Sequence, residues 1–159
     1  MSQWTHVVGT IQCIWDEATA IEQLGKPVLW DDHRVFKYGT PEYEDYFENV
    51  WKKAFEDNEK GEGIPMGSEG SLDWYFVDTK DDHVIGEGTL IAIQGDLRDY
   101  GGETEVQYII DWFIKAVGKA RFATLTINDD YSDEHVTVTI NWGDVCIVHY
   151  KAEGGDNHE

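Results

Sequence analysis

The chain has 159 residues, and its 32 acidic and 12 basic side chains give a formal net charge of −20. This length suits one domain with a substantial core, because a domain of this size buries roughly 70% of the surface that its unfolded chain exposes. So much negative charge repels phosphate backbones and anionic lipid, which argues against direct binding to nucleic acid or membranes, and it attracts basic surfaces. High solubility or a salt-adapted host would also account for the charge.

The first elements expected along the chain are a strand and a short helix. Side chains alternate from Thr5 to Trp15 as in a strand, with Gly9 marking a bulge or a close approach. A short helix is then expected between Asp16, which is suited to be its N-cap, and Gly25, which is suited to end it.

The clearest helix signal follows at residue 40. Thr40 and Pro41 are typical of an N-cap and a first helical position. Aromatic and aliphatic side chains then recur at helical spacing from Tyr43 to Phe55, which predicts one broad apolar stripe. The glycine-rich segment 59–71 is expected to end this helix and to form a loop.

The second half predicts mainly strands around one more helix. Residues 72–78 and 88–95 are expected to be strands of an antiparallel pair. Thr104 and Gln107 have capping-box spacing for a helix that ends near Gly118. Three further strands are expected at 121–129, 134–142 and 144–152.

This order predicts an α+β fold, in which an antiparallel sheet of five or six strands carries two main helices on one face. The arrangement expected is a split β-α-β, or ferredoxin-like, one. Residues 1–152 are expected to form a single domain, and residues 153–159 a flexible acidic tail.

The acids of the helix after Thr40 form the first candidate binding surface. Its members are Glu44, Asp45, Glu48, Glu56 and Asp57, and Lys52 and Lys53 interrupt the series. Between residues 42 and 59 a helix rises roughly 25 Å, a length over which duplex DNA presents roughly fifteen phosphates. This helix alone therefore cannot match the charge of DNA. A second candidate patch comprises Asp129, Asp130, Asp133 and Glu134, although acids at turns are also favoured for backbone hydrogen bonding.

A second candidate site joins two glycine-containing segments, GSEGSL and GDLRDYG. Arg98 lies between Asp96 and Asp99, an arrangement that predicts a local ion pair. The alternative is a ligand pocket in which Arg98 binds an anion and Ser68, Glu69 and Asp96 contribute. The glycine loop lacks the residue order of a nucleotide-binding P-loop.

No metal, cofactor or catalytic residue is predicted. The six histidines show none of the spacings of zinc sites, and no serine-hydrolase signature occurs. Cys13 and Cys146 both lie in strand-like apolar segments, so reduced, buried thiols are expected. With no signal-like or membrane-spanning segment, the protein is expected in the cytoplasm.

Three segments of the chain resemble parts of small uncharacterised bacteriophage proteins. They are WTHVVGTI, GSEGSL and GDLRDYG, roughly 20 residues in all. The resemblance implies a bacterial host cell, and it brings no established catalytic residues. It also implies a context in which small acidic phage proteins often inhibit host defence, including anti-CRISPR and anti-restriction proteins, some of which resemble DNA in charge.

Three functions are therefore expected as alternatives. The first is a non-enzymatic phage inhibitor of a bacterial nucleic-acid-targeting defence system, whose acidic surface occupies a basic nucleic-acid-binding surface of its partner. The second is a small-ligand protein that sequesters or acts on a nucleotide signal through the two glycine-containing segments. The third is a structural protein that self-associates through exposed aromatics such as Trp74, Tyr75 and Trp142.

Overall fold

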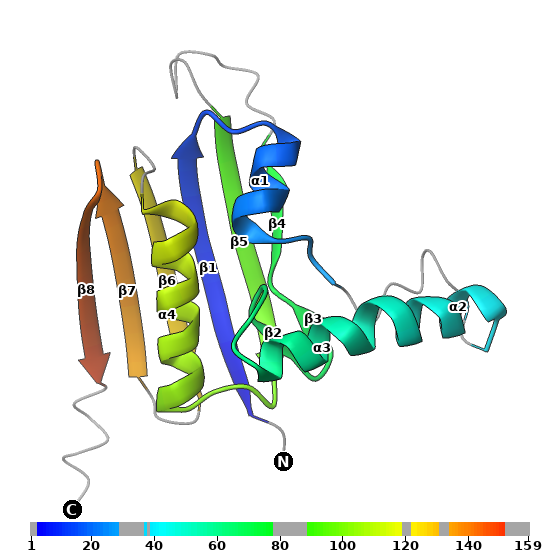
Figure 1. Ribbon diagram of the computed structural model, residues 1–159. Helices are drawn as coiled ribbons and strands as arrows, with labels where there is room; N and C mark the ends of the chain where they lie inside the picture. Colours follow the sequence, from blue (N-terminus) through cyan, green and yellow to red (C-terminus); the bar gives the residue numbers. More distant parts are fainter. Residues whose placement is uncertain are drawn as a thin grey trace, which may run out of the picture.

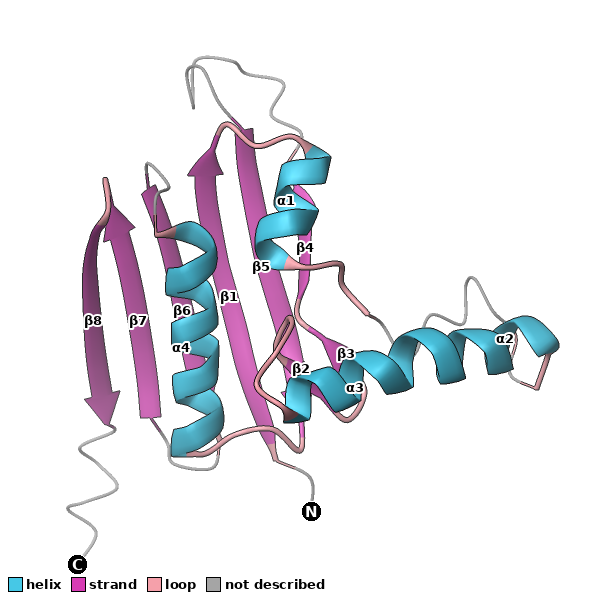
Figure 2. Cartoon of the chain, in the orientation of Figure 1, coloured by secondary structure: helices cyan, strands magenta, loops and turns pink. Residues whose placement is uncertain are grey.

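A six-stranded sheet forms the centre of the molecule. The computed structural model describes residues 3–28, 37, 39–77, 89–118, 122–130 and 134–151 (Figures 1 and 2). The sheet has the order β4-β5-β1-β6-β7-β8, and every neighbouring pair of strands is antiparallel. The strands are β1 (Trp4–Cys13), β4 (Asp73–Phe76), β5 (Thr89–Arg98), β6 (Phe122–Asp129), β7 (Glu134–Asn141) and β8 (Asp144–Lys151). An α+β fold with an antiparallel sheet of six strands is thus confirmed.

The sheet has one face covered by helices and one open face. Alternation along β1 places Val7 and Ile11 in the core, whereas the side chain of Val8 is 58% exposed on the other side. Helices α1 (Glu17–Leu24) and α4 (Glu103–Val117) both lie on the covered face (Figure 1). The core lies between these helices and the sheet, and its largest fully buried side chains include Phe113, Leu24, Ile91, Ile109, Leu125 and Ile140.

The predicted ends of the first helix are confirmed, and the predicted start of α4 is wrong by two residues. Asp16 accepts a hydrogen bond from the Thr19 N–H at 2.8 Å and so caps α1, which ends at Gly25. The N-cap of α4 is Gly102, not Thr104. Gly102 has a φ of +89°, which favours glycine, and its N–H donates to Asp129 at the end of β6. This contact between distant segments decides where the helix begins.

The acidic helix is continuous but is not α-helical throughout. It consists of α2 (Pro41–Tyr46), a π-helical turn η1 (Phe47–Trp51) and α3 (Lys52–Glu59). Thr40 caps it, as predicted, by accepting from the Tyr43 N–H. The helix begins well to the side of the sheet and runs back to the lower end of β5 (Figure 1).

The segment after the acidic helix contains a hairpin where a loop was expected. β2 (Met66–Gly67) and β3 (Gly70–Ser71) pair with each other, and the backbone of Gly67 lies against β5. A Cβ at residue 67 would lie 2.7 Å from the Arg98 carbonyl oxygen, so only glycine fits there without movement. The hairpin is therefore positioned by close backbone contact with the end of β5.

Two further predictions concern single residues. Neither Cys13 nor Cys146 forms a disulfide, as predicted, but only Cys13 is buried, whereas Cys146 is exposed on β8. Gly9 marks a close approach, since a Cβ there would lie 2.4 Å from the Thr124 carbonyl oxygen on β6. The predicted tail at 153–159 lies outside the described residues.

Candidate functional site

Three segments far apart in the sequence meet at the lower end of the sheet in Figure 1. They are the first half of β1, the β2–β3 hairpin and the last residues of β5 with the turn that follows. His6 on β1 is directly opposite Asp96 on β5. The Ser68 N–H of the hairpin donates to the Arg98 carbonyl at 3.0 Å. These are the segments that contain WTHVVGTI, GSEGSL and GDLRDYG.

Arg98 is held by two carboxylates at this junction. Its Nη1 atom lies 2.5 Å from Glu69 Oε1, and its Nε atom lies 3.8 Å from Asp99 Oδ2. The hydrogen bond and charge of Glu69 raise the pKa of Arg98 above its usual range. The predicted ion pair is therefore present, with Glu69 and Asp99 as the partners. The guanidinium ties the hairpin to the turn after β5.

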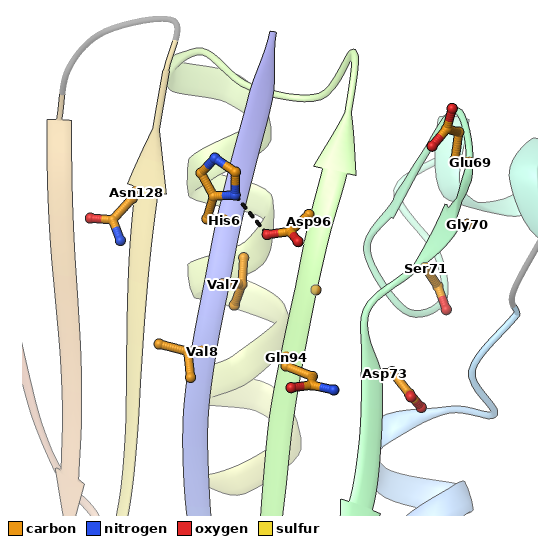
Figure 3. Close-up of a pocket in the computed structure, with 11 residues that line it drawn as sticks. His6, Val7, Val8, Glu69, Gly70, Ser71, Asp73, Gln94, Asp96 and Asn128 are labelled. Carbon is orange, nitrogen blue, oxygen red and sulfur yellow. Dashed lines mark hydrogen bonds and ion pairs between the residues drawn. The ribbon is translucent and has the colours of Figure 1, made fainter.

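A hollow of about 540 Å³ opens beside this junction on the open face of the sheet (Figure 3). We call it the open-face hollow. Its polar walls carry the carboxylates of Glu69, Asp73 and Asp96, together with His6 and Gln94. Three carboxylates make this a poor place for phosphate, because like charges repel in a confined space. The hollow suits a cationic or neutral group.

His6 is placed between two acids in the open-face hollow. Its Nδ1 atom lies 2.6 Å from Asp96 Oδ1, and its Nε2 atom lies 3.5 Å from Asp130 Oδ2 (Figure 3 draws the first contact). The hydrogen bond to Asp96 is the main reason that the pKa of His6 is raised, and partial desolvation opposes it. Both acids favour the imidazolium form. Sequence reasoning did not connect His6 with Asp96, since the pairing depends on strand register.

The acidic helix presents most of its predicted residues to solvent. Glu44, Asp45, Glu48 and Glu56 are exposed, whereas Asp57 is half-buried. Two of them have partners on the same helix: Lys52 lies 3.6 Å from Glu48, and the Asn49 side chain donates to Asp45 at 2.7 Å. Such exposed contacts contribute little to stability, so the face stays strongly negative.

Aromatic side chains support the π-helical turn in the middle of this helix. The rings of Phe47, Trp51 and Phe55 stack in series, with centroids 5.5 and 5.2 Å apart. Aromatic pairs of this kind contribute about 0.5–1.5 kcal/mol each beyond the area they bury. π-helical turns are rare in proteins, and those that occur are often found at functional sites. The periodicity of the sequence did not reveal this turn, because both helix types leave a similar apolar stripe.

The second predicted acidic patch does not form as expected. Asp129 is only 3% exposed and accepts hydrogen bonds from Gly102 N–H at 3.1 Å and from Thr5 Oγ1 at 3.4 Å. It is a structural carboxylate and belongs to no exposed surface. Asp130 is exposed but lies against His6. Asp133 and the side chain of Glu134 lie outside what the structure describes.

A second hollow, of about 420 Å³, lies between α3, the β2–β3 hairpin and the start of α4. We call it the helix hollow. Its lining includes the apolar and aromatic side chains of Phe55, Met66, Tyr100 and Tyr108, and the acids Glu59, Asp99 and Glu105. Of the predicted ligand residues, only Ser68 lines it, with its hydroxyl 3.2 Å from Asp99 Oδ2. The other three predicted residues, Glu69, Asp96 and Arg98, lie at or beside the open-face hollow.

The three aromatic residues predicted for self-association differ in exposure. Trp74 is 9% exposed, and its Nε1 atom donates to the Gly25 carbonyl at 2.7 Å, so it is a core residue. Tyr75 on the edge strand β4 and Trp142 in the β7–β8 turn are exposed. Burial of Trp74 removes one of the three from any interface.

The described residues contain no group of three or more histidine, cysteine or acidic side chains that could hold a metal ion. Within the same ranges, no helix is long and apolar enough to cross a bilayer. No protein-family model, curated protein or solved structure matches the chain. Its candidate sites are thus the acidic helix, the open-face hollow and the helix hollow.

Proposed function

We propose that the protein is a non-enzymatic binding protein whose acidic helix engages a basic, nucleic-acid-binding surface of a partner protein. The observation that carries the proposal is the exposure of Glu44, Asp45, Glu48 and Glu56 along one projecting helix of a strongly negative protein. Complementary charge of this kind accelerates association and selects basic partners. The resemblance of three segments to small phage proteins supports two further parts of the proposal. The partner is a bacterial defence protein that targets nucleic acid, and the chain is a phage inhibitor that acts in the cytoplasm.

The magnitude of the charge supports contact with part of a basic groove. Seven acids and two lysines on the helix fall well short of the roughly fifteen phosphates of a duplex of equal length. With Asp129 buried, the second patch does not make up the difference. The acidic helix therefore competes for part of the partner's surface and does not replace a whole duplex.

The test uses basic proteins enriched from bacterial lysate on a polyanion resin. The tagged protein is expected to capture members of this fraction at low salt, to release them as salt rises, and to lose them to added duplex DNA. A helix variant carries Glu44→Gln, Glu48→Gln and Glu56→Gln. Its control carries Glu17→Gln, Glu22→Gln and Asp144→Asn, which removes the same charge at other exposed positions.

We expect the helix variant to release the captured proteins at clearly lower salt than the control does, with both variants folded by circular dichroism. Equal salt release by the two variants would show that only overall charge matters, and it would refute the role of the helix. Captured proteins that duplex DNA does not displace would refute the nucleic-acid-binding surface as the target.

A second candidate function is the binding of a small ligand in the open-face hollow. The meeting of three distant segments around one hollow supports it. Because Glu69 and Asp99 hold Arg98 and three carboxylates line the hollow, a small organic cation fits better than the nucleotide expected from the sequence. Native mass spectrometry of the purified protein tests this candidate. A bound cation that Glu69→Gln releases would support it, and a bound nucleotide lost in Arg98→Ala would restore the nucleotide hypothesis.

We also infer a split β-α-β core for the scaffold that carries these sites. The order β4-β5-β1-β6, with α1 and α4 on one face, supports this inference. The β7–β8 hairpin then extends the sheet at one edge. An experimental structure in which β5 does not lie between β1 and β4 would refute it.

A further inference from the structure

The helix hollow has walls that internal hydrogen bonds hold in place. The Tyr108 hydroxyl donates to the Gly63 carbonyl at 2.5 Å, and the Asn58 amide donates to the Ile64 carbonyl at 2.8 Å. Tyr100 is only 7% exposed, and burial raises its pKa and that of Tyr108, so both phenols stay neutral at physiological pH. A hollow with fixed walls binds a ligand at a lower entropic cost than one that must form on binding.

The charge of the helix hollow is set mainly by two carboxylates. Asp99 is engaged by the Ser68 hydroxyl and by Arg98. Glu59 on α3 and Glu105 on α4 make no ion pair within the described ranges. No lysine or arginine is among the described residues that line the hollow.

One effect opposes a cation at this place. α4 begins at the edge of the hollow, and the start of a helix carries partial positive charge. Glu103 and Glu105 in its first turn already offset this charge, and the N–H of Gly102 is bound by Asp129. The helix start therefore does not outweigh Glu59 and Glu105.

We propose that the helix hollow receives an arginine side chain of the basic partner. The flat guanidinium stacks on aromatic rings, which Phe55, Tyr100 and Tyr108 supply, and its five donors match two carboxylates. A lysine would form the ion pairs but not the planar stacking. The inference rests on the proposed function, because it names the partner residue that the acidic protein would hold.

The position of the hollow connects it with the acidic helix. Phe55 and Glu59 belong to α3, so the hollow lies at the end of the helix whose exposed acids attract the partner. Protein interfaces commonly concentrate their binding energy in a few aromatic and arginine contacts inside pockets, surrounded by weaker charged contacts. The helix acids would speed the encounter, and the hollow would slow dissociation.

The experiment titrates N-acetyl-arginine amide into the isotope-labelled protein and follows backbone amides by NMR. N-acetyl-citrulline amide, which has the same shape without the charge, is the matched probe. We expect saturable shifts at Gly61, Gly67 and Tyr108 with the arginine probe in the millimolar range. The citrulline probe should bind at least about tenfold more weakly, a difference of roughly 1.4 kcal/mol.

Two variants show whether the carboxylates of the hollow are responsible. Glu59→Gln with Glu105→Gln should weaken the arginine probe at least about tenfold. Glu17→Gln with Glu22→Gln removes the same charge from exposed positions on α1, away from the hollow, and should change the affinity for the arginine probe less than about twofold. Equal weakening in both double variants, equal affinity for the two probes, or no shift at these amides would overturn the inference.

The lysate experiment separates this inference from the proposed function. If the acidic helix captures basic proteins but the arginine probe does not bind, the hollow is not an arginine site and the proposed function stands. If the probe binds the hollow without any helix-dependent capture, the proposed function is refuted and the site for a guanidinium group remains.

Discussion

The Asp129 carboxylate joins three parts of the chain. Asp129 is the last residue of β6, and its carboxylate accepts hydrogen bonds from the Gly102 N–H before α4 and from the Thr5 hydroxyl on β1. Removing a buried acceptor leaves a buried donor unsatisfied, which costs about 1–3 kcal/mol. Asp129→Ala should therefore lower the free energy of unfolding by this amount, measured by urea denaturation.

The neighbouring acid provides the control for this prediction. Among the described residues, the Asp130 side chain contacts His6 at an exposed position, so Asp130→Ala should change the free energy of unfolding by less than about 1 kcal/mol. Equal losses in the two variants would show that Asp129 contributes nothing beyond its charge.

The hydrogen bond between His6 and Asp96 makes a prediction about pH. Because the folded protein raises the pKa of His6, the imidazolium stabilises the fold fully below the unfolded pKa of about 6.5. This contribution is lost as the pH rises through the higher pKa of the folded state. Asp96→Asn should lower the His6 pKa, measured from its ring protons by NMR. The free energy of unfolding of this variant should also fall less than that of the wild type between acidic and alkaline pH.

Asp73→Asn is the matched control, since Asp73 lines the same hollow without a described contact to His6. It should shift the His6 titration less than Asp96→Asn does. A His6 titration that is the same in the wild type and in Asp96→Asn would contradict the assigned cause.

At the scale of elements, the β2–β3 hairpin separates the two hollows. Ser68 faces the helix hollow and Glu69 faces the open-face hollow, so a shift of the hairpin changes both. Gly67→Ala would place a Cβ 2.7 Å from the Arg98 oxygen and 2.9 Å from its nitrogen. We expect destabilisation of about 1–3 kcal/mol, as for other overpacked positions. The amide of residue 68 should also exchange its hydrogen faster, because it donates to the Arg98 carbonyl.

Ser68→Ala tests the same hairpin without crowding it. It removes only the hydroxyl contact with Asp99 and should leave the amide exchange at residue 68 nearly unchanged. If Gly67→Ala exchanges no faster than Ser68→Ala, the close approach does not position the hairpin.

At the scale of the whole molecule, the net charge of −20 opposes compaction. Like charges on the folded surface repel, and salt screens them over a Debye length of about 10 Å at 0.1 M. We expect the urea midpoint to rise with sodium chloride from low to moderate concentration, measured by circular dichroism. Sucrose at matched osmolality serves as the uncharged control. A midpoint that falls with salt would mean that attractive ion pairs, such as Arg98 with Glu69, outweigh the repulsion.

The sequence alone determined most elements of this protein, because their signals are local. Asp16, Gly25 and Thr40 mark helix ends through hydrogen bonds with residues three or four positions away. Gly118 follows the last residue of α4, and alternation from Thr5 predicts β1. The acidic helix and its exposed carboxylates were found for the same reason: a helix places its side chains by spacing alone.

Only the tertiary structure decided which distant residues meet. Strand register places His6 beside Asp96, and the end of β6 buries Asp129 and moves the start of α4 to Glu103. The helix hollow needs walls from α3, the hairpin and α4 together. His6 and Asp96 are 90 positions apart, and Gly102 and Asp129 are 27 apart. Their pairing depends on how whole elements pack, which no local pattern of side chains specifies.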